Sequence, residues 1–591
     1  MTPIPNIRHT GRDLWRAISL IWQADRAMAT LTVILQVILA ILPVLSLYYI
    51  KAMVETITGG KGSFSSFAPL IVFFSAIQFL QALAGQYVAY INTIHQQKLS
   101  DYLSGKVLHK AIEVDYAYYE NPAYHDTLHL AQQQSLYKAT LLLNNLNTLL
   151  LNSLSLLFLT GFFFTMHSQF ALFFVILSLP LAVIKWYSGF TLMRLERRFA
   201  PLEREADYLH QTITGVASAK EVRVLGYGQS FIRKFNTIRS YIHDEKRKLH
   251  VRLTWYSLLA ETAEIIAMAF IFFLLAKNTW EKTISIGLFV IYIQGFQRLQ
   301  NISKSFLQSL VQVFQQRIFL KDLFTFFDIP SSNSVTQQYP FPVLKEGLVV
   351  QNASFAYPQS NKEVLHNINL QCAPGKIIAI VGENGSGKST LVKLLARLYP
   401  LQQGNISISG TGIGHIEESD FRNHSIFLFQ DFEKYFLTVE EIIVLGDDST
   451  KRDTVKIEQA ATLADAHNFI TKLSKGYQTR MGRIFEGSEQ LSGGQWQKLA
   501  LARVFYKNAS MIVLDEPTSA LDAHAEFEVF KNLQAISAGK VIILITHRLY
   551  NLKMADCIYV MQEGNIVEKG SFEELVSGNG PFRQMYEVQK L

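Results

Sequence analysis

The sequence predicts two domains of different fold class, an all-α transmembrane domain with six long helices and an α/β P-loop nucleotide-binding domain. Three observations support this prediction. Six apolar segments occupy the first part of the chain. A glycine-rich loop in the second part lies between an apolar strand and a helical segment. Further along, a run of apolar residues ends in two adjacent carboxylates.

Composition narrows the class of protein. The chain has 591 residues, more than a single core accommodates, and 49% of them are hydrophobic, which is high for a soluble protein. The net charge is +7, but no segment resembles a nucleic-acid-binding module, so we interpret the excess Lys and Arg as membrane-flanking and expect no nucleic-acid partner. The two cysteines, Cys372 and Cys557, imply no disulfide framework and fit a reducing compartment.

The first 27 residues do not read as a signal peptide, because their arginines are not followed by a short apolar region with a cleavage site. The apolar residues between Asp13 and Trp22 have helical spacing. This pattern predicts a short amphipathic helix lying on the cytoplasmic membrane face, with a solvated helix as the alternative.

Six apolar segments follow, and each has about the 20 residues that a bilayer-spanning helix needs. Amides within them, such as Gln36, Gln78, Gln81 and Gln294, should face the bundle interior or a water-filled cavity. The segments are 28–50, 68–91, 142–165, 170–190, 254–276 and 283–305.

The connections predict the orientation of the chain. The loops 92–141 and 191–253 are long, charged and helical in pattern, which places them and the N-terminus in the cytoplasm. An even number of spans returns the C-terminal domain to the same side, where ATP is present. No proline occurs between Gly287 and Phe327, so the sixth helix should be about 60 Å long and leave the bilayer. We expect a cytoplasmic amphipathic segment at 1–27, the six-helix transmembrane domain at 28–328, a linker at 329–344 and the nucleotide-binding domain at 345–591.

The fifth span carries two carboxylates on one helical stripe. Ser257, Glu261, Glu264 and Met268 share a face, and carboxylates in a span should face the bundle interior. One hypothesis is that Glu261 and Glu264 bind a proton or a cationic group of a substrate. The structural alternatives are that they pair with Lys185 or Arg298, or that they lie where the helix has already left the bilayer.

The glycine-rich loop has the P-loop pattern G-x-x-x-x-G-K-[ST] between an apolar strand at 376–381 and a helical segment at 391–398. Its glycines let backbone N–H groups turn toward phosphate oxygens, and the helix N-terminus adds a positive dipole end. Lys388 can reach the β- and γ-phosphates, and Ser389 can bind Mg²⁺. The predicted ATP-binding residues here are Gly382, Glu383, Asn384, Gly385, Ser386, Gly387, Lys388, Ser389 and Thr390.

The second catalytic element is the apolar strand that begins at Met511 and ends in Asp515 and Glu516. Asp515 suits Mg²⁺ bound through water. Glu516 suits a general base that polarises the attacking water.

The segment Leu491–Gln495 resembles the signature motif of ATP-binding cassette (ABC) proteins, through Ser492, Gly493, Gly494 and Gln495. The resemblance covers about residues 345–591. It implies that Tyr357 stacks on adenine, that Gln430 is the Q-loop residue acting in catalysis and at Mg²⁺, that Asp522 belongs to the D-loop, and that His547 is the catalytic switch histidine.

The whole layout resembles the exporter-type ABC half-transporter. In that family, short coupling helices at the tips of the cytoplasmic loops dock on the ATPase, and 118–124 and 215–224 look like these tips. The segments 430–435 and 482–490 resemble a bacterial subgroup associated with peptide export. One departure is Glu441, because many exporters have Asn there, and we expect it to alter at most a surface contact.

The resemblance further implies a dimer, since the signature motif of one chain closes on ATP held by the P-loop of another. We expect a homodimer with two intact sites, and a heterodimer remains open. The expected function is ATP-driven export of a substrate, a peptide in first place, across the inner (plasma) membrane, with both termini cytoplasmic. The alternatives are lipid flipping, multidrug efflux and a non-pumping channel or regulator; an importer and a soluble ABC ATPase fit the layout less well.

Overall fold

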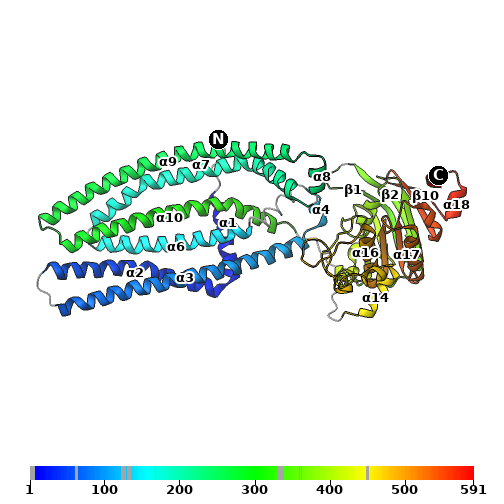
Figure 1. Ribbon diagram of the computed structural model, residues 1–591, viewed down its shortest axis with the longest axis horizontal. Coiled ribbons are helices and arrows are strands. Elements are labelled where there is room, and N and C mark those ends of the chain that lie inside the picture. Colours follow the sequence, from blue (N-terminus) through cyan, green and yellow to red (C-terminus); the bar gives the residue numbers. More distant parts are fainter. Residues whose placement is uncertain are drawn as a thin grey trace. The chain divides into compact units, whose positions relative to one another are not determined.

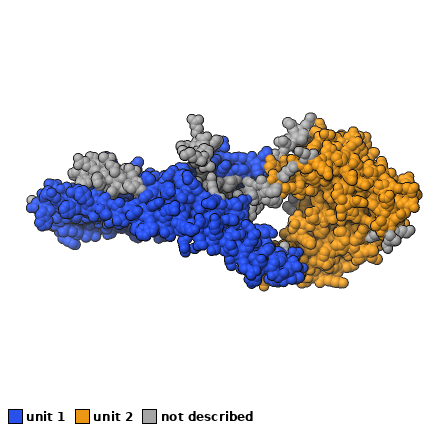
Figure 2. All heavy atoms as spheres, turned by 90° about the horizontal axis from the view of Figure 1, so that it is seen from above, with its two compact units in different colours: residues 1–114, 122–330 blue, residues 115–121, 331–591 orange. Residues whose placement is uncertain are grey.

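The computed structural model describes residues 7–59, 64–121, 128, 135–166, 168–216, 218–330, 338–358, 360, 362–447 and 452–590. The chain forms two compact units, coloured separately in Figure 2. Unit 1 comprises Met1–Val114 and Pro122–Pro330. Unit 2 comprises Asp115–Asn121 and Ser331–Leu591, so a short segment of the first long loop belongs to the second unit.

Unit 1 contains six long helices, which confirms the predicted fold class of this domain. Each has at least 32 residues, more than the ~20 that cross a bilayer. Helix α2 lies beside α3, α6 beside α10, and α7 beside α9 (Figure 1). The helices are α2 (Arg26–Thr58), α3 (Phe64–Glu113), α6 (Ser135–Met166), α7 (Ser168–Thr214), α9 (Gly228–Trp280) and α10 (Ile286–Phe327).

Four of these helices are apolar enough, over the described residues, to cross a membrane: α2, α3, α9 and residues 139–164 of α6. Most side chains of the predicted span 170–190 lie outside the described set. Helix α10 does not reach the same apolarity, since Gln294, Gln297 and Arg298 interrupt its first half. It continues without a break for 42 residues, as the absence of proline predicted.

The carboxylate stripe of the fifth span lies on α9. Glu264 is only 6% exposed, and the Nζ atom of Lys304 on α10 lies 3.4 Å from its Oε2 atom. The predicted partners were different. Arg298 instead donates a hydrogen bond to the carbonyl oxygen of Pro43 (3.0 Å), and the side chain of Lys185 lies outside the described set. The described partner of Glu264 is therefore Lys304.

The amphipathic N-terminal helix is α1 (Ile7–Ala24), longer than predicted. Ala17, Leu14 and Leu20 pack in a cluster with α6 and α10, while Trp15 and Trp22 remain exposed. Arg16 forms a two-pronged ion pair with Asp328 at 2.7 and 2.8 Å, which ties α1 to the end of α10. The helix thus packs against the bundle along one face and offers exposed tryptophans on another.

Two short helices lie at the predicted loop tips. Helix α4 (Tyr116–Tyr119) overlaps the start of the expected first tip, 118–124, of which 122–124 lie outside the described residues. Helix α8 (Ala219–Val224) falls within the expected second tip. Gly215, one of the two predicted helix breakers, directly follows the end of α7 at Thr214, whereas Pro122 lies outside the described residues.

Unit 2 is an α/β domain, as predicted, and its strands form two sheets. The antiparallel sheet has the strand order β2-β1-β4-β5. The larger sheet has the order β10-β9-β3-β8-β7-β6, in which only the β9–β10 pair is antiparallel. The strands are β1 (Leu348–Ala356), β2 (Glu363–Cys372), β3 (Lys376–Gly382), β4 (Gln403–Ile408), β5 (Thr411–Gly412), β6 (Ser425–Leu428), β7 (Met511–Asp515), β8 (Val541–Ile545), β9 (Cys557–Gln562) and β10 (Asn565–Gly570).

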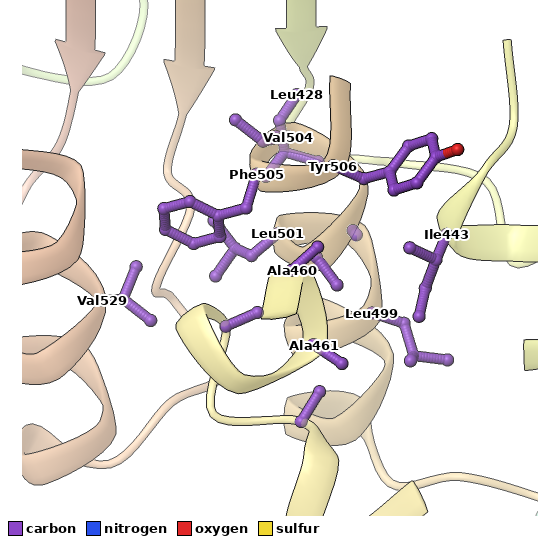
Figure 3. Close-up of a cluster of buried hydrophobic side chains, with 14 of the residues drawn as sticks. Leu428, Ile443, Ala460, Ala461, Leu499, Leu501, Val504, Phe505, Tyr506 and Val529 are labelled. Carbon is purple, nitrogen blue, oxygen red and sulfur yellow. The ribbon is translucent and has the colours of Figure 1, made fainter. Parts of the chain in front are cut away.

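Helices complete unit 2. One large apolar cluster joins β6 and β7 to α13, α14, α16 and α17, and Figure 3 shows part of it around Leu501 and Phe505. The helices are α11 (Lys388–Leu395), α12 (Glu418–His424), α13 (Val439–Ile443), α14 (Thr454–Leu463), α15 (His467–Ile470), α16 (Gly493–Lys507), α17 (Ala523–Ala535), α18 (Phe572–Ser577) and α19 (Pro581–Lys590).

The unusual Glu441 has a structural explanation. It is the third residue of α13, and its carboxylate accepts hydrogen bonds from the backbone N–H and hydroxyl of Thr438, which completes a capping box. In place of Asn, Glu441 therefore stabilises the start of α13.

Candidate functional site: an ATP-hydrolysing centre

The parallel strands of the larger sheet bring distant motifs to one edge. Strand β3 ends in the P-loop, β7 ends in Asp515, and β6 and β8 lead to Gln430 and His547. Because the carboxyl ends of parallel strands meet at the same edge, side chains from four separate parts of the sequence gather there. This edge is the candidate site.

The P-loop wraps the start of α11, which begins at Lys388, three residues before the predicted helical segment. Gly387 precedes it with φ +100°. A Cβ atom here would lie 2.6 Å from Leu365 Cδ2, so both the conformation and the space require glycine.

Lys388 is buried inside this loop. Its Nζ donates to the carbonyl oxygens of Gly382 and Glu383, both at 2.8 Å, and contacts Ser386 Oγ at 3.3 Å. Burial lowers the pKa of Lys388, and the nearby charges of Asp515 and Glu516 oppose that shift. An ammonium held by weak neutral acceptors in this way is well prepared to receive phosphate oxygens.

Asp515 is 5% exposed. Burial, with a contribution from the charge of Glu516, raises the pKa of Asp515 to about 6, while a hydrogen bond from Ser389 and the charge of Lys388 act against this. A buried carboxylate that lacks full charge compensation, next to a hydroxyl, fits a hard cation such as Mg²⁺. The described residues hold no group of three acidic, His or Cys ligands, so such a cation would also need phosphate and water oxygens.

Glu516 connects two other predicted residues. Its Oε1 lies 2.7 Å from His547 Nε2, and its Oε2 accepts a hydrogen bond from Gln430 Nε2 at 2.9 Å. Glu516 also has φ +49°, a conformation that non-glycine residues seldom adopt and that often marks functional sites. The structure therefore brings Gln430, Glu516 and His547 together, as the motifs predicted.

Tyr357 follows β1 and lies beside α11. Its hydroxyl forms a hydrogen bond of 3.0 Å with Thr390 Oγ1. Its ring packs edge-on against Tyr399, with 5.3 Å between centroids, and Lys393 Nζ lies 5.5 Å from the ring centre. Sequence reasoning selected Tyr357 and Thr390 and missed Lys393 and Tyr399, which belong to no motif.

The signature motif forms the N-terminus of α16. Ser492 caps the helix, and its backbone N–H donates a hydrogen bond to Gln495 Oε1 at 2.9 Å. A Cβ atom on Gly494 would lie 2.8 Å from the carbonyl oxygen of Ala520, so this glycine permits close approach to the D-loop. Gly493 is the first residue of α16, so Ser492, Gly493 and Gly494 together form a helix N-terminus, whose free N–H groups suit an anion.

Three side chains around the D-loop have defined structural positions. Asp522 accepts hydrogen bonds from the N–H groups of His524 and Ala525, which lower its pKa, and so caps α17. Gln497 bonds to the carbonyl oxygen of Glu516 (3.0 Å) and to the N–H of Ala520 (2.7 Å). Arg548 pairs with the buried Glu526 at 2.6 Å. No sequence pattern pointed to Gln497 or Arg548.

Two family models match the two parts of the chain separately. Residues 365–519 match the family model described as ABC transporter, and residues 29–303 match the ABC transporter transmembrane region. The chain combines both regions and belongs to the ABC transporters. This confirms the family predicted from the signature motif.

Two relatives are similar over nearly the full length, and a third over about two thirds of it. The subtilin transport ATP-binding protein SpaT of Bacillus subtilis is 28% identical, with 98% of this chain and 94% of that protein covered. The nisin transport ATP-binding protein NisT of Lactococcus lactis subsp. lactis is 28% identical, with 98% of this chain and 96% of that protein covered. An ATP-dependent lipid A-core flippase of Aliivibrio fischeri is 29% identical, with 70% of this chain and 71% of that protein covered.

A solved structure of a bacterial Atm1-family ABC exporter with ATP bound has the same fold. The TM-score is 0.74, the sequence identity is 21%, and 98% of each chain is covered. The chain therefore has the exporter fold, with one transmembrane domain and one ATP-binding domain, which is the arrangement of a half-transporter.

Proposed function

We propose that the protein is one half of a dimeric, ATP-driven exporter that moves a peptide out of the cytoplasm. The observation that carries this proposal is the cluster of Gln430, Glu516 and His547 beside the P-loop, in a chain that also contains the six-helix exporter domain. The relatives similar over nearly the whole chain are named for subtilin and nisin transport, which supports a peptide as the substrate.

Each residue of the cluster has a role in the proposed hydrolysis. Lys388 and the P-loop N–H groups bind the phosphates of ATP, whose adenine stacks on Tyr357. Glu516 accepts the proton of the attacking water, and His547 and Gln430 orient Glu516 and the γ-phosphate. Mg²⁺, held through Ser389, Gln430 and Asp515, would neutralise charge on the β- and γ-phosphates.

The arrangement of motifs supports a dimer. The helix N-terminus at Ser492, Gly493 and Gly494 suits a phosphate, while Lys388 serves the phosphates of its own P-loop. The proposed dimer lets Ser492 close on ATP held by a second copy. ATP then drives transport only through its greater affinity for the closed state.

The proposed location is the bacterial plasma membrane, with both termini in the cytoplasm. Lys and Arg clusters in the loops 92–141 and 191–253 support this orientation.

The substrate is tested by ATP hydrolysis of the purified protein in liposomes. We expect peptides to stimulate hydrolysis and to accumulate inside vesicles whose ATP-binding domains face outward. The second candidate, a lipid flippase, rests on the similarity to the lipid A-core flippase. Stimulation by lipid and not by any peptide would replace the first proposal with the second.

A further inference from the structure

A short acidic segment of the first long loop is bound within unit 2. Asp115–Asn121 belongs to that unit, and Ala117 packs against the apolar cluster formed by β1, β2, β3 and α11. The segment contains helix α4 and ends near Glu120, whose side chain is 35% exposed. Its contacts show which part of the ATP-binding domain holds it.

Glu120 makes two strong contacts. Lys393 Nζ lies 2.6 Å from its Oε1 atom, and the hydroxyl of Tyr399 donates a hydrogen bond to its Oε2 atom. Burial alone would raise the pKa of Glu120, but the hydrogen bonds from Lys393 and Tyr399 and the charge of Lys393 outweigh it, so the pKa lies below its usual range. Glu120 is therefore a charged anchor at neutral pH.

Both partners of Glu120 also contact Tyr357. Lys393 Nζ lies 5.5 Å from the centre of the Tyr357 ring, and the Tyr399 ring packs edge-on against it at 5.3 Å and 89°. Tyr116, on α4, contacts the same two residues: its ring packs edge-on against Tyr399 at 5.9 Å, and Lys393 lies 5.8 Å from its centre. These contacts form a closed cluster with Glu120 at one end and Tyr357 at the other.

We propose that Glu120 is a positioning residue of the adenine site, which fixes the Tyr357 ring for stacking by holding Lys393 and Tyr399. This inference rests on the proposed function, in which Tyr357 stacks on the base of ATP. An aromatic ring held by a cation and a second ring has fewer orientations to lose when the base binds, so Glu120 strengthens ATP binding without touching the nucleotide.

Thermodynamic linkage gives a second consequence. If the segment 115–121 strengthens ATP binding, bound ATP must strengthen the hold on that segment by the same factor. The base of the nucleotide, and not only its phosphates, then contributes to how firmly this part of the loop is bound.

Three substitutions in the full-length protein test the inference: Glu120→Gln removes the charge, Lys393→Met removes the cation, and Tyr399→Phe removes only the hydroxyl. Each should raise the KM for ATP by about two- to fivefold while kcat changes by less than about twofold. Inhibition by inorganic tripolyphosphate, which has no base, should be unchanged. Asp115→Asn is the matched control, because Asp115 is exposed on the same segment, and both constants should remain those of the wild type.

Hydrogen exchange of residues 115–121 gives an independent readout. ATP should slow exchange there in the wild type, and this protection should be lost in Glu120→Gln. An unchanged KM in all three variants, or an equal loss of tripolyphosphate affinity, would overturn the inference.

Tyr357→Ala separates the two levels of the argument. If it leaves the ratio of ATP to tripolyphosphate affinity unchanged, the adenine role of Tyr357 is wrong and the inference falls with it. If it lowers that ratio while Glu120→Gln does not, the role of Glu120 alone is wrong.

Discussion

At the scale of single residues, the proposed chemistry depends on Glu516, whose two carboxylate oxygens face His547 and Gln430. A carboxylate shared in this way has a defined orientation. This role as the base can be tested by replacing Glu516 with glutamine. The amide has nearly the same shape and keeps most contacts with the neighbouring side chains, but it cannot accept the proton of the attacking water.

We expect Glu516→Gln to bind ATP with near wild-type affinity and to hydrolyse it about 10²- to 10⁴-fold more slowly. Equilibrium nucleotide binding and phosphate release measure the two effects. Glu528→Gln, the same change on a partly exposed side chain of α17, is the control and should hydrolyse ATP normally. Near wild-type turnover of the Glu516 variant would remove this residue from the role of the base.

Asp515 makes a prediction about pH. Its pKa of about 6 in the folded protein lies above the value of an exposed aspartate, so the folded state retains a proton that the unfolded state has lost. Stability of the nucleotide-free protein therefore falls as pH rises from about 4 to about 6, and the loss persists above that range.

Asp515→Asn should remove this loss and raise the free energy of unfolding at neutral pH by on the order of 1–3 kcal/mol. The gain should shrink as the pH is lowered toward 5, which thermal unfolding of the nucleotide-free protein would follow. Asp522→Asn is the control: it removes the same charge at an exposed helix cap, where Asn also caps well, and no gain is expected. A gain for Asp515→Asn that is independent of pH would contradict the argument.

At the scale of elements, α9 and α10 are joined by the pair between Glu264 and Lys304. Each charge is costly in an apolar bundle when its partner is removed, whereas replacing both by neutral groups removes the cost. The pair gives Glu264 a structural role, and it leaves Glu261, on the same face, as the carboxylate more readily available to a cationic substrate.

We expect Glu264→Gln and Lys304→Met to destabilise the protein singly by up to about 3–5 kcal/mol, and the double variant to recover most of that loss. Thermal stability in detergent measures this coupling. Glu261→Gln is the comparison: it should leave stability nearly unchanged and weaken stimulation of ATP hydrolysis by the transported substrate. Additive losses in the double variant would show that the two charges do not stabilise each other.

At the scale of the whole molecule, the proposed dimer shares each ATP site between two chains. The signature residues Ser492, Gly493 and Gly494 and the P-loop of one chain then act in different sites. A bulky cation at Ser492 would block closure and oppose the positive end of α16.

In dimers mixed from wild-type and Ser492→Arg chains, ATP hydrolysis should fall below the value set by the fraction of wild-type chains. Two affinity tags allow mixed dimers to be purified and assayed. Gln534→Arg, on the exposed side of α17, is the control and should have no such effect. A strictly proportional loss would indicate that the two sites work independently.

The sequence by itself determined the fold class, the six long helices, the P-loop and the Asp515–Glu516 strand end. Each of these features follows from a local sequence pattern: the length of an apolar run, the absence of proline from α10, or a glycine-rich loop between a strand and a helix. The resemblance added Tyr357, Gln430, Asp522 and His547, which match the order of the family's motifs along the chain rather than any local periodicity.

Only the tertiary structure decided which side chains meet. Lys304, and not Arg298, lies beside Glu264, and Glu120 lies beside Lys393, which is 273 positions away in the sequence. Local periodicity says which face of a helix is apolar, but it contains no information on the register of one helix against another or on which loop lies against which strand end. Those choices depend on packing of the complete core, and they produced the contacts of Gln497, Lys393 and Tyr399 that no motif predicted.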